Sequence, residues 1–264
     1  MRQPAATIRG LGGLRPESPT LQLQSDACQP LRLFATLFVN HRALTSPPTS
    51  AAPQLTAAQL ACRRGTRLLF KDLSLDVGAG QIVWVRGHNG RGKTSLLRLA
   101  AGLSTPEHGE VQSDGVSVRR SPDYRDRLVY IGHANALKED LTATEALEFL
   151  LRVHRRPCAV KTVHAALERV GLHSRRNAPV RTLSQGQRRR VALARLAVES
   201  TPSLWILDEP FDALDVDGVH RLNLIMKEHT ARGGSIVLTS HLLLDSELLA
   251  PIEIDLDRYA DLRG

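Results

Sequence analysis

The sequence predicts an α/β fold in which a mostly parallel core sheet is joined by a small antiparallel β-subdomain and an inserted helical subdomain. Short apolar runs alternate with helical patterns between residues 81 and 256, which is typical of a parallel sheet covered on both faces. The segment 109–118 alternates around Asp114-Gly115 and therefore predicts a β-hairpin. The stretch from about 134 to 190 carries helical patterns and is interpreted as the helical insertion.

Five apolar runs are expected to form the strands of the core sheet. Buried parallel strands have this composition because helices cover both of their faces. The runs are QIVWVRG (81–87), LVYIG (128–132), SLWILD (203–208), SIVLTS (235–240) and IEIDL (252–256).

Helices are expected where apolar residues recur at helical spacing between recognisable end signals. Thr142 and Glu145 form a capping box that begins one helix, and Gly102 and Gly171 lie where two others should end. The expected helices are 93–103, 142–154, 161–171 and a basic helix that begins at Ser184.

The composition limits the possible partners and location. The chain has 264 residues, 42% of them hydrophobic, and a formal net charge of +8, which favours nucleotides, nucleic acid or acidic lipid. No segment reaches the roughly 18–20 consecutive apolar residues of a membrane-spanning helix, so no transmembrane segment is predicted. The three cysteines have no metal-ligand spacing and are interpreted as reduced thiols in a cytosolic compartment.

Residues 1–53 differ from the rest of the chain in composition. They are rich in Pro, Gly, Ser, Thr and Gln, contain no lysine, and have Glu17 and Asp26 as their acidic residues. This composition predicts a disordered N-terminal extension. An organellar targeting peptide and a translation start placed too far upstream are the alternatives.

A phosphate-binding loop is predicted between the first core strand and the first helix. The motif GHNGRGKT (87–94) matches G-x-x-x-x-G-K-[ST] in full. Its glycines let backbone N–H groups surround phosphates, Lys93 places a positive charge near them, and the Thr94 hydroxyl can ligate Mg²⁺. The candidate nucleotide-binding residues here are Gly87, His88, Asn89, Gly90, Arg91, Gly92, Lys93, Thr94 and Ser95.

Two acids follow the strand in LWILDEP (204–210), at the edge where open parallel sheets bind ligands. Asp208 is the candidate that holds Mg²⁺ through water, and Glu209 is the candidate catalytic residue that orients or deprotonates the attacking water. With the phosphate loop, these acids predict a nucleoside triphosphatase. The sequence contains no guanine-recognising Asn-Lys-x-Asp motif, which disfavours a GTPase.

A second candidate phosphate site is the segment LSQGQ (183–187), where Ser184 and Gln187 form a capping box around Gly186. Because the chain already has one phosphate loop, this site is expected to serve a nucleotide held by a second subunit. Arg188 and the two arginines after it are expected on the solvated face of the helix, with nucleic-acid contact as the less favoured alternative. The residues expected to face inward are Val191, Leu193, Ala194 and Ala197.

The order of these motifs resembles that of the ABC-transporter ATPase subunits. The phosphate loop, LSQGQ, LWILDEP, ALD (213–215) and the lone His241 after SIVLTS follow one another as in that family, from about residue 55 onward. The resemblance implies a P-loop NTPase ABC ATPase fold over 54–264 and a head-to-tail dimer that encloses two ATP molecules with Mg²⁺. Asp215 would belong to the dimer-spanning D-loop. His241 would contact the γ-phosphate as a catalytic residue beside Lys93 and Glu209.

Longer stretches resemble the cytochrome c maturation ATPases of the CcmA, or haem-exporter, type. They are KTSLLRLAAGL (93–103), YIGHANALKEDLTATEALEFL (130–150), LSQGQRRRVALARL (183–196) and LWILDEPFDALD (204–215). The resemblance implies a haem-transporting ATPase that energises a CcmB-type permease and works with other cytochrome c maturation membrane proteins. It would lie peripherally on the cytoplasmic face of the inner membrane, without a nucleic-acid partner. An ABC exporter ATPase with a lipid, peptide or drug cargo is the alternative.

Three positions depart from the general ABC pattern. His133 stands at the Q-loop glutamine position and is a candidate nucleotide and Mg²⁺ contact. Arg63 and Arg64 stand where an adenine-stacking aromatic is expected, which weakens the prediction of ATP over GTP. Gln185 replaces the first glycine of LSGGQ and crowds the approach of the opposing γ-phosphate. Hydrolysis is still expected because Lys93, Asp208, Glu209 and His241 are all present.

Overall fold

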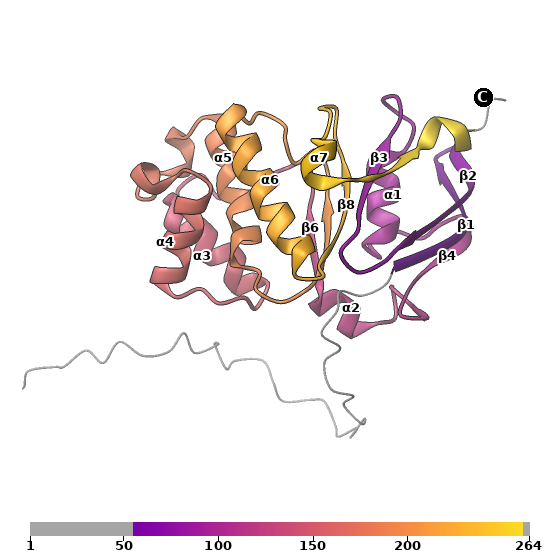
Figure 1. The fold of residues 1–264 in the computed structure, drawn as a ribbon, viewed down its shortest axis with the longest axis horizontal. Coiled ribbons are helices and arrows are strands. Elements are labelled where there is room, and N and C mark those ends of the chain that lie inside the picture. Colours follow the sequence, from indigo (N-terminus) through magenta and orange to yellow (C-terminus); the bar gives the residue numbers. More distant parts are fainter. Residues whose placement is uncertain (1–54, 261–264) are drawn as a thin grey trace, which may run out of the picture. The chain divides into compact units, whose positions relative to one another are not determined.

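The computed structural model of the chain describes residues 55–260. The segment 1–53, expected to be a disordered extension, lies outside the described residues. The described part contains two sheets and the helices that pack on them (Figure 1). The parallel sheet has the strand order β6-β7-β8-β3-β9, and the antiparallel sheet has the order β2-β1-β4-β5.

The elements follow one another along the chain with these bounds. The strands are β1 (Leu55–Arg64), β2 (Arg67–Val77), β3 (Ile82–Arg86), β4 (His108–Ser113), β5 (Val116–Ser117), β6 (Leu128–Ile131), β7 (Leu204–Leu207), β8 (Ser235–Thr239) and β9 (Ile252–Asp255). The α-helices are α1 (Lys93–Ala100), α2 (Pro122–Asp126), α3 (Ala143–Val153), α4 (Val160–Arg169), α5 (Gln185–Leu193), α6 (Val216–Ala231) and α7 (Ser246–Leu249). Short 3₁₀ turns are η1 (His173–Arg175), η2 (Val180–Thr182), η3 (Ala194–Val198) and η4 (Leu256–Tyr259).

The parallel sheet confirms the five core strands expected from the sequence, each to within one residue at either end. β3 lies at the point where strand order reverses, between β8 and β9. Every residue of β7 and β8 is buried, as expected for strands covered on both faces. The segment after β3, which carries the phosphate loop, therefore emerges at a topological switch point, where sheets of this kind bind ligands.

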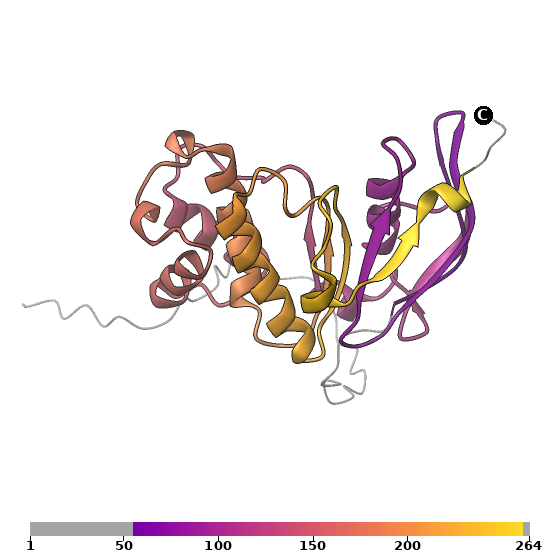
Figure 2. The same ribbon diagram turned by 45° about the horizontal axis from the view of Figure 1, so that its top comes forward.

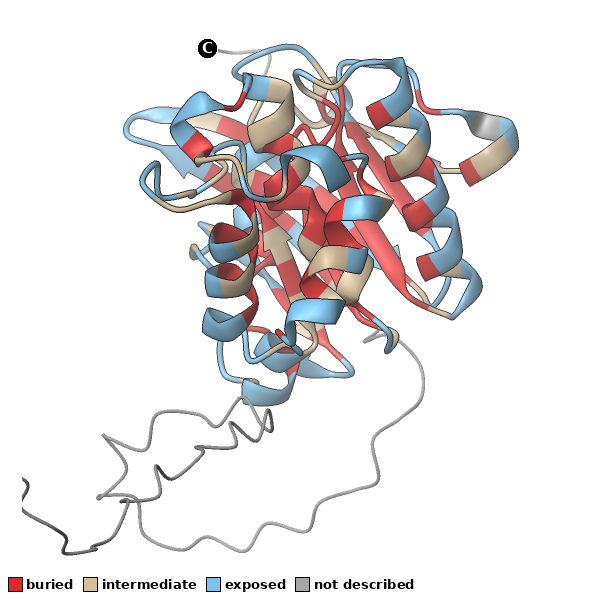
Figure 3. Ribbon diagram, turned by 90° about the vertical axis from the view of Figure 1, so that its left-hand side faces the viewer, coloured by how far each residue is buried: buried red, intermediate tan, exposed pale blue. Residues whose placement is uncertain are grey.

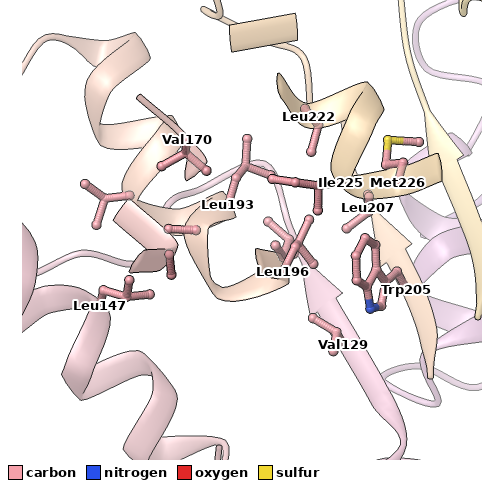
Figure 4. Packing of buried hydrophobic residues seen from close by; sticks show 14 of the residues in the cluster. Val129, Leu147, Val170, Leu193, Leu196, Trp205, Leu207, Leu222, Ile225 and Met226 are labelled. Carbon is pink, nitrogen blue, oxygen red and sulfur yellow. The ribbon is translucent and has the colours of Figure 1, made fainter. Parts of the chain in front are cut away.

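Side chains of the parallel sheet alternate between two hydrophobic cores. On β7, Trp205 and Leu207 pack with the helical insertion and α6, whereas Leu204 and Ile206 pack toward the antiparallel sheet. Figure 4 shows the first core, where Trp205 and Leu207 lie near Met226 of α6. α1 lies between the two sheets and fills the second core (Figures 1 and 2). In Figure 3 the core strands are red along most of their length, whereas buried segments of the helices alternate with exposed ones.

The antiparallel sheet is larger than the sequence predicts. The hairpin β4–β5 at Asp114-Gly115 is confirmed, but the long pair β1–β2 was not expected. Register shifts interrupt the pairing of β1 with β2, and Gln59 has a left-handed φ of 48°, so the alternation of buried and exposed residues is broken. β4 pairs with the irregular part of β1, and position 109 of β4 has room only for glycine, because a Cβ there would lie 2.3 Å from the Ala58 carbonyl oxygen.

The helices of the insertion agree with the sequence at their starts. Thr142 caps α3 and Ser184 caps α5, and both form complete capping boxes. α6 was not predicted, although it is the longest helix among residues 55–260, because it follows the acid-rich motif 208–215 and carries a weak apolar stripe. None of the helices in residues 55–260 has the length and hydropathy needed to cross a membrane. Cys62 and Cys158 are buried.

Candidate nucleotide-binding site

The phosphate loop joins β3 to α1 with glycines in conformations that other residues avoid. Gly87, Gly90 and Gly92 have φ values of 137°, 79° and 98°, and Gly92 is also the N-cap of α1. A Cβ on Gly92 would lie 3.1 Å from the Leu69 Cβ, so β2 packs closely under the loop. Lys93 folds back across the loop, and its Nζ donates to the Gly87 carbonyl at 2.8 Å.

The two acids after β7 are held by side chains of α1 and β8. Asp208 Oδ1 accepts hydrogen bonds from Thr94 Oγ1 at 3.3 Å and from Thr239 Oγ1 at 3.0 Å. The backbone N–H of Glu209 donates to Thr239 Oγ1 at 2.9 Å, and Glu209 Oε2 accepts from the His241 backbone N–H at 3.0 Å. Thr239 thus fixes both acids at the carboxyl edge of the sheet.

Glu209 has an unusual environment for a carboxylate. It is 8% exposed, and its φ of 48° lies in the left-handed region. Oε1 has no hydrogen-bond partner within residues 55–260, although the ring Nε2 of His241 lies 3.5 Å away. Burial raises the pKa of Glu209, opposed chiefly by His241. A buried carboxylate oxygen without a partner can accept a hydrogen bond from a bound molecule.

A cavity of about 480 Å³ brings most of the predicted residues together. Its lining includes Asn89, Gly90, Gly92, Lys93, Thr94, Ser95, His133, Asp208, Glu209 and His241. Gly87 and His88 lie beside it, in a second hollow of about 590 Å³ that shares Lys93 and His241. These volumes lie in the range of small-molecule sites. No cluster of three or more His, Cys, Asp or Glu side chains suited to a metal ion occurs within residues 55–260.

The second candidate phosphate site does not line this cavity. Ser184 Oγ accepts from the Gln187 N–H at 3.2 Å, and Gln187 Oε1 accepts from the Ser184 N–H at 3.0 Å. A Cβ on Gly186 would lie 2.4 Å from the Ala213 carbonyl oxygen, so the start of α5 packs directly on the loop before α6. Asp215 caps α6, and its Oδ1 accepts from the Gly218 N–H at 2.9 Å.

A protein-family model described as "ABC transporter" matches residues 70–212 of the chain, which include the phosphate loop, the start of α5 and both acids. The chain belongs to the ABC transporter family. A protein of Nitrosomonas europaea is 46% identical over 201 residues, which are 75% of this chain and 92% of that protein. One of Pseudomonas putida strain KT2440 is 45% identical over 207 residues, 78% and 98% of the two chains. Both are named cytochrome c biogenesis ATP-binding export protein CcmA.

Solved structures give the same fold. A putative ABC transporter ATP-binding protein of Pyrococcus furiosus matches with a TM-score of 0.69 and 21% identity, over 79% of this chain and 100% of that one. An ATP-binding subunit of an ABC transporter matches with a TM-score of 0.64 and 27% identity, over 78% and 83% of the two chains. The P-loop NTPase ABC ATPase fold expected from the sequence is confirmed.

Of the positions that depart from the general ABC pattern, His133 and Arg64 line the cavity and Arg63 does not. The His133 side chain is 75% exposed, lines the cavity, and has its Nδ1 3.7 Å from Asp212 Oδ2. Arg63 turns aside, because its Nε binds the Glu107 carboxylate at 2.9 Å. Arg64 does line the cavity, together with Arg67, which the sequence analysis did not single out.

The expectation that Arg188 to Arg190 form a solvated face is wrong. Arg189 is 3% exposed, and its guanidinium donates to backbone carbonyls at the end of β7. Arg190 is largely buried against Asp215 and Asp217. Arg188 is partly buried, with its Nε bonded to the carbonyl of Val180 at 3.0 Å. For Arg189 the cause is tertiary, because backbone carbonyls after β6 and β7 lie beside this helix and need donors. Val191, Leu193 and Ala194 are buried as expected, and Ala197 is partly buried.

Asp257, in η4, is a residue near the site that sequence reasoning missed. Its Oδ2 accepts from the His88 N–H at 3.1 Å and lies 2.6 Å from His88 Nδ1, while Oδ1 accepts from Arg91 Nε at 2.8 Å. Burial acts to raise the pKa of Asp257, but the hydrogen bonds from His88 and Arg91 hold it below its ordinary value. The unusual side chains of the phosphate loop therefore have a common partner near the end of the chain.

Proposed function

We propose that this chain is the ATP-hydrolysing subunit of an ABC transporter complex for cytochrome c biogenesis, serving the export or release of haem for attachment to c-type cytochromes. The observation that carries the proposal is the single cavity lined by Lys93, Thr94, Asp208, Glu209 and His241. The cytochrome c assignment is supported by relatives named CcmA that are 45–46% identical over more than 90% of their own length.

The residues present fit ATP with Mg²⁺. The backbone N–H groups of the phosphate loop and the ammonium of Lys93 would hold the phosphates. Thr94 Oγ1 and Asp208 Oδ1 lie 3.3 Å apart at the cavity wall, and such paired oxygens suit Mg²⁺, Thr94 directly and Asp208 through water. His133 is a further candidate contact. When bound, Mg²⁺ would supply positive charge that offsets the negative charge of the phosphates.

Glu209 would act on the attacking water. Its unpartnered Oε1 can accept a proton from water, while the bond from the His241 N–H to Oε2 holds the carboxylate in place. A carboxylate whose pKa is raised by burial is a stronger base than one in water. The His241 ring lies 3.5 Å from Oε1 and shares a hollow with Lys93, so it would contact the γ-phosphate beside that lysine.

A second copy of the chain would complete the site. Ser184, Gly186 and Gln187 begin α5 away from the cavity of their own chain, and Ser184 and Asp215 are exposed. The Ser184 oxygen accepts from the Gln187 N–H, but its hydroxyl hydrogen can still be donated, so this helix start can bind a phosphate presented by a partner. Head-to-tail pairing would therefore place this segment on the γ-phosphate of the other copy, with Asp215 at the contact.

The complex would work at a membrane. We place the chain peripherally on the cytoplasmic face of the inner membrane, bound to a CcmB-type permease and other cytochrome c maturation proteins, without nucleic acid. The relatives' name, an ATP-binding export protein for cytochrome c biogenesis, supports this placement.

The test is the covalent haem of c-type cytochromes, detected by haem staining in cells that lack the gene or carry Lys93→Ala. Both strains should lose the signal while b-type haem stays normal, and the Lys93→Ala chain should be present at the level of the wild-type chain. Restoration by the wild-type gene, but not by Lys93→Ala, would tie the effect to ATP. Normal c-type cytochromes in both strains would contradict the assignment and leave an ABC exporter ATPase with a lipid, peptide or drug cargo.

A further inference from the structure

Arg189 of α5 has a buried guanidinium surrounded by backbone carbonyls of the nucleotide site. Its Nη2 donates to the carbonyls of Asp208 and Glu209, both at 2.8 Å. Its Nη1 donates to the Gly132 carbonyl at 3.0 Å and to Asn135 Oδ1 at 3.2 Å. One side chain thus joins three segments: the end of β7, the loop after β6, and α5 itself.

The hydrogen bond from Arg189 to the Glu209 carbonyl helps to fix the backbone conformation of Glu209. With a φ of 48°, the Glu209 backbone is turned so that its carbonyl accepts from Arg189 while its carboxylate reaches the cavity and the His241 N–H. Left-handed backbone is unfavourable for a residue with a Cβ and persists where surrounding contacts hold it. The bond from Arg189 is one contact that holds it.

Arginine suits this position because it has several acceptors on two loops to satisfy. Its planar guanidinium presents five N–H donors in a fixed geometry, which lets one residue satisfy acceptors on two loops. Burial lowers the pKa of Arg189, but the nearby carboxylates Asp212, Asp208 and Glu209 oppose that change and favour the charged form. A glutamine or a lysine can reach some of these carbonyls, though not all of them together.

We infer that Arg189 is a positioning residue for hydrolysis, because it holds the backbone of Glu209 and thereby orients the Glu209 carboxylate. Arg189 belongs to α5, the helix whose first turn would bind the nucleotide of the second copy. A displacement of α5 is therefore passed to the base that acts on the chain's own ATP. Arg189 is 3% exposed and does not line the cavity, so it acts through Glu209 without touching ATP. This inference rests on the proposed ATPase function.

The test compares Arg189→Gln and Arg189→Lys with the control Arg188→Gln in the purified full-length chain. Arg188 lies on the same helix, 32% exposed, and bonds to the carbonyls of Val180 and Leu183 instead of those after β7. Three quantities are measured for each variant: kcat for ATP hydrolysis, Kd for a fluorescent ATP analogue with Mg²⁺, and the melting temperature.

The inference predicts that Arg189→Gln lowers kcat about 100-fold, the scale of a misplaced general base, with Kd within about threefold of wild type. Arg189→Lys should recover part of kcat, and Arg188→Gln should keep it within about threefold. A kcat for Arg189→Gln near that of wild type, or kcat and Kd lost in proportion, would overturn the inference. So would failure of both Arg189 variants to fold, because the residue would then be structural. A wild-type chain that binds ATP but hydrolyses none would contradict the proposed function, and this inference with it.

Discussion

His229, near the end of α6, is a buried neutral histidine whose titration predicts a loss of stability at acidic pH. Its exposure is 0%, and its ring stacks on Trp205 with 3.6 Å between centroids. Nε2 lies 2.9 Å from the Ser203 carbonyl, so it carries the proton and donates it. Nδ1 has no hydrogen-bond partner within residues 55–260, and burial lowers the pKa to about 4. Protonation would place an unpaired charge in the core.

The magnitude follows from the two pKa values. The unfolded chain titrates this histidine near 6.5, so between pH 6.5 and about 4 the unfolded state binds a proton that the folded state does not. The stabilisation is complete above pH 6.5 and is lost as the pH falls. The free energy of unfolding should drop by about 2 kcal/mol from pH 7 to pH 5, and by about 3 kcal/mol at pH 4.

Urea denaturation followed by tryptophan fluorescence at pH 7 and pH 5 measures this loss. The control variant is His229→Phe, which keeps an aromatic ring against Trp205 and removes the titrating group. Carboxylates titrate in both proteins, so the difference between their losses isolates His229. Wild type should lose about 2 kcal/mol more than the variant. Equal losses in the two proteins would refute the buried neutral histidine.

Three further variants, one of them a double substitution, probe the site. Gly186→Ala adds a Cβ 2.4 Å from the Ala213 carbonyl oxygen, so the loop before α6 must move. ATP turnover should fall at least about tenfold while ATP affinity is retained. Unchanged turnover would contradict this contact. Replacing Arg64 and Arg67 with Ala removes two cations from the cavity and should weaken ATP and GTP binding alike by about tenfold in a fluorescent-nucleotide titration. A change for one base alone would show stacking instead. Asp257→Ala leaves the His88 N–H and Arg91 Nε without their acceptor. The free energy of unfolding, measured by urea denaturation, should fall by about 1 kcal/mol. A variant as stable as wild type would count against the contact.

The parts of this molecule that local sequence determines were predictable. A capping box needs four consecutive residues, and those at Thr142 and Ser184 form as expected. The phosphate loop is equally local, since its glycines and Lys93 lie within one short motif between β3 and α1. The five parallel strands were predictable because burial on both faces imposes an apolar composition.

The parts that depend on contacts between distant segments were not predictable. Arg189 looks like one of three surface arginines, and its burial follows from carbonyls that come 19 and 20 residues later in the chain. Asp257 meets His88 across 169 residues, with no pattern in either segment to indicate the pairing. The hairpin β1–β2 escaped detection because its bulges break the period of two on which strand prediction depends.

The most direct test of the account is whether two copies of this chain enclose ATP. Glu209→Gln removes the base while keeping the size of the side chain, so ATP should bind with Mg²⁺ and remain intact. Size-exclusion chromatography with light scattering should then give a dimer that carries one ATP per chain, and adding Ser184→Arg at the start of α5 should return it to a monomer. A Glu209→Gln chain that is monomeric while each copy holds one ATP would contradict the shared site.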